Sequence, residues 1–200
     1  NGIQFKDLIF NKSDFNIYQQ DLVFFENLLK TEPSENKIVI KNSNIFFKND
    51  NNDILFINKI KKSEFYYDAY NLVNVLKSKN EIFNIPYKLM IKNDKFNKLV
   101  LSEFNSQKIR LNIENQISYD SEIQQGLMKV SFVNQTTSLN YKLNKNSLDF
   151  STEGQKNQYD GLIEFKPFYL KANFNYEGIS TKNWFDDNSI FYNLIKSELF

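Results

Sequence analysis

The feature that most constrains the fold of this chain is an apolar residue at every second position, repeated along most of its length. In the clearest example, residues 109–119, only Asn115 interrupts an apolar row made of Ile109, Leu111, Ile113, Ile117 and Tyr119. A period of two is typical of a β-strand with one buried and one solvated face. These eleven residues predict an extended strand of roughly 36 Å.

Further runs of the same kind follow one another, with short polar turns between them. They cover residues 37–47, 53–60, 85–91, 128–132, 139–143, 148–150 and 168–176. The turns at 48–52 and 144–146 are rich in Asn, which tolerates the left-handed backbone of a hairpin turn. One polar face on each strand favours an antiparallel sheet over a parallel sheet buried on both sides.

Three segments predict short helices. Residues 20–30 carry a broad apolar face that ends before Pro33, and residues 190–199 carry an apolar stripe after two aspartates. Asp68 is suited to cap a third helix, with Ala69, Leu72, Val73 and Leu76 at helical spacing.

We therefore expect a mainly β fold. Its long antiparallel strands would form a curved sheet, an open groove or a sandwich, accompanied by two or three short α-helices. No linker rich in Pro, Gly or Ser divides the sequence, so residues 1–200 are expected to form a single elongated domain or a fragment of a larger region.

The composition argues against several kinds of chemistry. The chain has no Cys and no His, which excludes disulfides, thiol nucleophiles and a Ser-His-Asp triad and removes the usual nitrogen ligand of zinc. Its 25 basic and 24 acidic side chains nearly cancel, which disfavours nucleic acid as a partner. The Asn- and Asp-rich segment at 48–52 lacks the glycine and glutamate of a calcium loop and is better interpreted as a hairpin tip. We expect no enzymatic activity, cofactor or metal.

A long one-sided sheet must cover its apolar face or leave an exposed patch that takes a ligand or a membrane. An apolar trough suits acyl chains, because each buried methylene contributes about 0.8 kcal/mol. The candidate lipid-binding residues are Ile109, Leu111, Ile113, Ile117 and Tyr119 in one strand and Leu139, Tyr141 and Leu143 in a facing one. The alternative is a filled β-sandwich that serves as a structural or protein-interaction module without a ligand. A carbohydrate-binding sandwich would instead need exposed aromatic residues, for which Tyr66, Tyr169 and Trp184 are candidates.

Two parts of the sequence resemble a known family. Residues 159–170 read YDGLIEFKPFYL and are followed by an alternating strand to Tyr176 and an amphipathic segment at 187–199. Residues 37–47 read KIVIKNSNIFF and precede a second strand that begins ILFI at residue 54. This layout resembles AsmA-like proteins of Gram-negative bacteria.

The resemblance implies a function in the cell envelope. Members of that family are anchored in the inner membrane by an N-terminal helix and extend into the periplasm, and the larger ones are similar to bridge-like lipid-transfer proteins. The chain would then be a periplasmic segment that lacks the membrane anchor and shields lipid acyl chains in a β-groove. The resemblance does not imply a protein partner.

Overall fold

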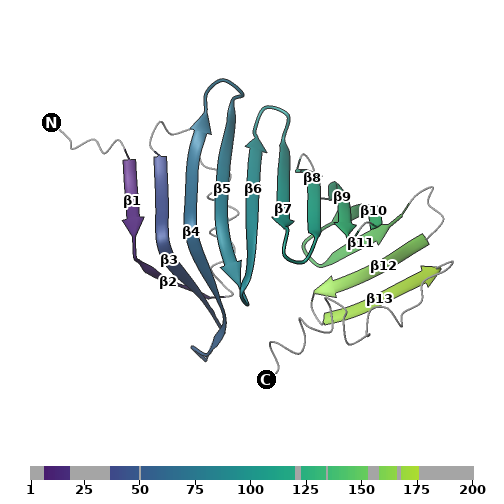
Figure 1. The fold of residues 1–200 in the computed structure, drawn as a ribbon. Coiled ribbons are helices and arrows are strands. Elements are labelled where there is room, and N and C mark those ends of the chain that lie inside the picture. The colour runs from purple at the N-terminus through teal and green to yellow at the C-terminus, as the bar shows by residue number, and fades with distance from the viewer. Residues whose placement is uncertain are drawn as a thin grey trace.

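The computed structural model describes residues 7–18, 37–49, 51–119, 123–133, 135–152, 158–165 and 168–175, and these residues form one β-sheet (Figure 1). Its thirteen strands are β1 (Asp7–Asn11), β2 (Asp14–Tyr18), β3 (Lys37–Lys48), β4 (Ile54–Asp68), β5 (Val73–Ile82), β6 (Ile85–Asp94), β7 (Leu99–Ser106), β8 (Leu111–Ser118), β9 (Gln124–Phe132), β10 (Gln135–Leu143), β11 (Ser147–Ser151), β12 (Gln158–Phe165) and β13 (Phe168–Asn175). The mainly β prediction is confirmed.

The sheet is a meander. From β3 to β13 every strand pairs antiparallel with the next one in the sequence, while β1 and β2 pair parallel with successive parts of β3 at the edge. Each strand is rotated relative to its neighbour, and the accumulated twist turns β12 and β13 across the direction of β4 and β5 in Figure 1. Extensive contacts between described strands occur only between sheet neighbours, so these strands form a single open layer and not a sandwich.

The helix predicted at Asp68 is wrong. The backbone N–H groups of Tyr70 and Asn71 donate to the Asp68 carboxylate, which therefore closes a hairpin turn between β4 and β5. Leu72 has a positive φ of 56°, which ends the turn, and Val73 begins β5. The apolar residues at helical spacing therefore belong to a turn and to the alternating strand that follows it. The helices predicted at 20–30 and 190–199 lie outside the described residues.

An irregularity crosses β3 and β4 at the same level. Asn42 of β3 has a φ of 49°, and Lys61, at the same level of β4, is an extra residue relative to β5. The buried Ser43 side chain stabilises this point, because its hydroxyl donates to the carbonyl of Lys41 at 2.7 Å and accepts from the backbone N–H of Ser13 at 3.1 Å. One side chain therefore ties β3, next to Asn42, to the segment that joins β1 and β2.

Replacing Ser43 with alanine is expected to lower the free energy of unfolding by about 1–3 kcal/mol, because the substitution leaves the Ser13 N–H without its acceptor. Urea denaturation measures the change. Ser131→Ala is the control, since the Ser131 hydroxyl bonds with Thr136 on the exposed surface, and it should cost under about 0.5 kcal/mol. Equal losses in the two variants would contradict the role of Ser43.

Candidate functional site

The sheet confines the charged side chains of its strands to one face. Cross-strand partners share a face, so the strand register assigns every residue to one side. Every Asp, Glu and Lys within the thirteen strands lies on the side that carries Glu64, Lys77 and Glu114, which we call the charged face. The other side, which carries Leu76, Ile91 and Ile113, is the uncharged face.

Seven of the eight predicted lipid-binding residues lie on the uncharged face or continue its alternation. Leu111, Ile113 and Ile117 belong to β8 and Tyr119 directly follows that strand, while the others belong to β10, namely Leu139, Tyr141 and Leu143. The two groups are separated by β9 and lie side by side on one sheet. They do not face each other across a groove.

Ile109 is the exception. It lies in the turn at 107–110, where Arg110 has a φ of 51° and its N–H donates to the carbonyl of Gln107. The strand consequently begins at Leu111 and has 8 residues, not the eleven that the sequence predicted. Ile109 keeps the alternation of the row only in the sequence, because a turn separates it from the strand.

The uncharged face differs between the two halves of the sheet. Over β3–β6 it contains a group of buried polar side chains, namely Ser43, Asn58, Ser63, Asn74, Ser78, Asn80 and Asn93. No buried side-chain nitrogen or oxygen among the described residues lacks a hydrogen-bond partner. Over β8–β13 the same face consists mostly of half-buried Ile, Leu, Val, Phe and Met side chains. The apolar character required for acyl chains is therefore concentrated in the second half.

One row of cross-strand partners crosses seven strands, from β7 to β13, without a charged residue. It consists of Val100, Ile117, Gly126, Tyr141, Phe150, Gly161 and Ala172. The two aromatic rings of this row lie over its two glycines, since a Cβ atom at Gly126 would be 2.1 Å from Cζ of Tyr141 and one at Gly161 would be 2.4 Å from Cζ of Phe150. The two rings therefore cover the backbone of β9 and β12 at the positions where a side chain is missing.

Tyr141 also explains the polar interruption of the predicted row. Its ring passes over Gly126 of β9, and its hydroxyl donates to Oδ1 of Asn115 on β8 at 2.7 Å. The same arrangement is found twice more, at Tyr87 to Asn58 (3.0 Å) and at Tyr119 to Asn93 (3.0 Å). Each phenol thus reaches an asparagine two strands away, which ties β4, β6, β8 and β10 together on the uncharged face.

Burial raises the pKa of the phenols of Tyr141 and Tyr87, although hydrogen bonds to asparagine oppose the effect. Both groups are therefore expected to ionise above the usual pH of 10. Since their pKa values are higher in the folded protein than in the unfolded chain, their contribution to stability is complete below about pH 10 and is lost as the pH rises through the folded-state values.

An alkaline titration followed by tyrosinate absorbance tests this expectation. Tyr141→Phe should remove a late step from the curve. Tyr70→Phe is the control because that side chain is 94% exposed, and it should leave the late step in place. Loss of the same step in both variants would contradict the burial of Tyr141.

Two grooves lined by described residues lie on the charged face. One has a volume of about 560 Å³ and is lined by Lys62, Glu64, Lys77, Lys79 and Lys88, among others. Another of about 320 Å³ lies over β6–β9 and combines Met90, Leu101 and Leu127 with charged side chains. The predicted trough lined by Ile, Leu, Phe and Tyr is neither of these grooves. A third groove, of about 730 Å³ over β9–β13, includes Gly126, Tyr141, Phe150 and Gly161 among charged-face residues such as Lys142 and Asp149.

The described residues offer no metal site, because none of their Asp and Glu side chains form a group able to hold an ion. Asn49 and Asp53 at the predicted hairpin tip bond with each other, with Asn49 Nδ2 2.9 Å from Asp53 Oδ2. This is the arrangement of a polar turn.

Comparison of the chain with protein-family models, with curated proteins and with solved structures finds no match. The resemblance to AsmA-like proteins stays a prediction.

Two signals of this face could be found in the sequence. Asn115 interrupts the apolar row at a position that the Tyr141 hydroxyl reaches, and Gly126 lies opposite the same tyrosine in the hairpin of β9 and β10. Glycine in a strand commonly marks the close approach of another group. The sequence alone does not show which aromatic residue reaches either position, because an alternating pattern does not determine the strand register.

Proposed function

We propose that the uncharged face over β7–β13 binds lipid acyl chains and that the chain is a non-enzymatic lipid-shielding segment. The observation that supports this proposal best is the row from Val100 to Ala172, which is uncharged on all seven strands. Strands lie about 4.8 Å apart, so the row is about 29 Å long, nearly the hydrocarbon thickness of a bilayer. An acyl chain could lie along it at full length.

The accessibility of this face supports the same proposal. Ile113, Ile117 and Leu139 are half-buried, and no described element packs over them as a second layer. The exposed fraction of Leu170 on β13 is 55%. An apolar surface of this extent gains free energy when an apolar ligand covers it, because each methylene removed from water contributes about 0.8 kcal/mol.

The mechanism would be passive. The described strand residues of this face include no Asp, Glu or Lys, since all of these lie on the opposite side. The acyl chain would contact β7–β13 while the charged face stays in water. We extend the proposal to the cellular setting that the resemblance implies, a periplasmic segment of an AsmA-like envelope protein that is anchored in the inner membrane.

One finding bears on membranes directly: the described residues include no helix long and apolar enough to cross a bilayer.

Native mass spectrometry of the purified chain, with lipid analysis of a denatured extract, tests the proposal. We expect phospholipid or fatty acid at close to one molecule per chain. A ligand-free mass after gentle preparation, together with failure to take up added fatty acid, would contradict the proposal and favour a structural or protein-interaction module.

A further inference from the structure

The charge of the sheet is distributed unevenly along the charged face. Over β3–β6 this face carries ten lysines and four carboxylates, a net charge of +6, whereas over β7–β13 it carries three lysines and five carboxylates, a net charge of −2. We call the charged face of β3–β6 the lysine face. Its ten lysines are Lys37, Lys41, Lys48, Lys59, Lys61, Lys62, Lys77, Lys79, Lys88 and Lys92.

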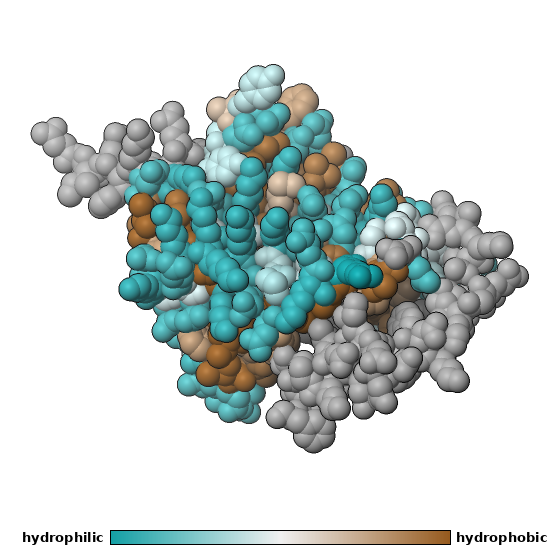
Figure 2. Space-filling view, in the orientation of Figure 1, coloured by the Kyte–Doolittle hydropathy of each residue, from teal (hydrophilic) through white to brown (hydrophobic). Residues whose placement is uncertain are grey.

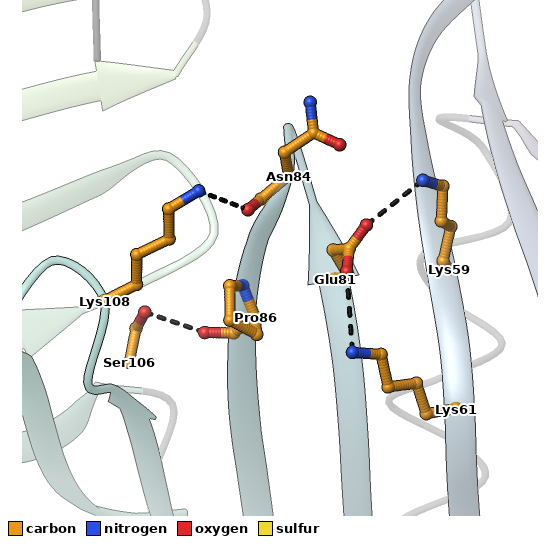
Figure 3. Close-up of polar contacts among 7 residues, drawn as sticks. All are labelled: Lys59, Lys61, Glu81, Asn84, Pro86, Ser106 and Lys108. Carbon is orange, nitrogen blue, oxygen red and sulfur yellow. Dashed lines mark hydrogen bonds and ion pairs between the residues drawn. The ribbon is translucent and has the colours of Figure 1, made fainter. Parts of the chain in front are cut away.

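Two carboxylates of the lysine face are each shared between two lysines. Glu64 lies 2.6 Å from Lys37 Nζ and 3.1 Å from Lys62 Nζ. Glu81 lies between Lys59 and Lys61, at 3.1 and 3.5 Å (Figure 3). The paired lysines lower the pKa of both carboxyls, so both are ionised at neutral pH. Each carboxylate neutralises only one of its two lysines, so each group of one carboxylate and two lysines keeps a net positive charge.

Other lysines of this face have no acidic partner among the described residues. Lys79 and Lys88 are exposed and form no ion pair there. Together with Lys62 and Lys77 they line the groove of about 560 Å³ on this face. Figure 2 shows hydrophilic side chains over most of the middle of this side of the sheet, with hydrophobic ones toward its margins.

We propose that the lysine face docks on the surface of an anionic phospholipid bilayer. Its cations are all lysines, which act as hydrated point charges and suit a field of phosphates without fixed geometry. Clusters of four to eight basic residues bind anionic membranes, and each adds about a fivefold factor in affinity. The ten lysines spread over four strands match an extended surface better than one small ligand.

Apolar residues beside the lysines favour a bilayer over other polyanions. Ile57 lies on the lysine face of β4 and is 40% exposed, and Ile54, 53% exposed, is the cross-strand partner of Lys48. Both precede Lys59 and Lys61 on the same strand. Basic residues next to exposed apolar side chains are typical of surfaces that enter the lipid headgroup region.

Single-stranded nucleic acid fits this face less well. Its binding requires aromatic rings open for base stacking. Tyr66 lies in the middle of the lysine face, but Nζ of Lys37 and Nζ of Lys77 lie over its ring at 5.6 and 5.7 Å from the centroid. The docking proposal does not depend on the acyl-chain proposal, because the two concern opposite faces of the sheet.

Sedimentation of the 200-residue chain with vesicles tests the proposal. One set of vesicles is pure phosphatidylcholine, and in the other a third of the lipid is phosphatidylglycerol. We expect binding only to the anionic vesicles, weakening as salt is raised. The double variant Lys79→Gln/Lys88→Gln should bind roughly 30-fold more weakly.

The control is Lys129→Gln/Lys142→Gln, which removes the same charge from the charged face outside the lysine face. It should change vesicle affinity less than about threefold. Equal losses in the two double variants, or equal binding to both kinds of vesicle, would overturn the proposal. Binding of a thymidine oligonucleotide that needs Lys79 and Lys88, without binding to vesicles, would overturn it in favour of nucleic acid.

Discussion

Gly161→Ala is expected to lower the free energy of unfolding by roughly 3 kcal/mol, the upper end of the cost of overpacking. An added Cβ atom would lie 2.4 Å from Cζ of Phe150 and 2.6 Å from the backbone carbonyl oxygen of Lys171. The phenyl ring can move, but the carbonyl belongs to the ladder of β12 and β13 and cannot shift without breaking strand pairing. Urea denaturation with near-ultraviolet circular dichroism measures the loss.

Gly126→Ala provides the comparison that isolates the cause. There the three nearest atoms all belong to the Tyr141 side chain, so shortening that side chain relieves the clash. The double variant Gly126→Ala/Tyr141→Ala should lose less unfolding free energy than the sum of the two single variants, by about 1–3 kcal/mol. In Gly161→Ala/Phe150→Ala most of the glycine cost should remain. Full relief in both pairs would show that the backbone contact at Lys171 is unimportant.

Ile113→Asp is expected to reduce bound fatty acid at least roughly tenfold, because a carboxylate on an apolar surface must keep its water. Ile113 lies between Phe104 and Val130 in a cross-strand row of the uncharged face. A fluorescent fatty acid titrated into the purified chain measures the loss of affinity. Thermal unfolding of the same sample shows whether the variant folds.

Gln116→Asp is the matched control. It introduces the same carboxylate three residues along β8, but on the charged face, where Gln116 is exposed. Fatty-acid binding should stay within about threefold of the starting protein. If Ile113→Asp unfolds the chain, Val130→Trp replaces it as a test, since the larger ring would occupy the same surface. Unchanged binding in a folded variant of either position contradicts the site.

The mainly β character of the fold could be predicted from the sequence because its dominant signal is local, whereas the choice between one open sheet and a sandwich could not. Alternation in each segment predicted the strands, and Asn-rich turns predicted hairpins such as that between β10 and β11, where Asn144 Oδ1 accepts from the backbone N–H groups of Asn146 and Ser147. The same alternation predicts that Ile113 and Ile117 lie on one side of the sheet, and likewise the apolar residues of β10.

The errors arose where a turn interrupts the period without changing it. Ile109 continues the alternation of β8 but precedes a left-handed Arg110, so it belongs to a turn. Asp68 was interpreted as a helix cap, yet an aspartate accepting N–H groups two and three residues ahead serves a hairpin turn equally well. In both cases the backbone dihedral angles determine that the chain turns, and the spacing of apolar residues carries no information about these angles.

The distribution of charge could not be seen from its total. A net charge of +1 for the whole chain conceals a face of +6 over β3–β6, because these strands contain ten of the 25 basic residues but only four of the 24 acidic ones. Likewise, Asn115 interrupts an apolar pattern in the sequence but is the acceptor that holds Tyr141 over Gly126. Both features depend on which strands are neighbours, so they emerge only when the strands are paired.

Photolabelling with a diazirine fatty acid, followed by peptide mapping, tests the acyl-chain site most directly. We expect adducts at alternating positions of β8 and β10, on Ile113, Ile117 and Leu139, and none on Gln116 or Asn140 of the charged face. Adducts that follow the charged face, or that are absent from β8 and β10, would contradict the account.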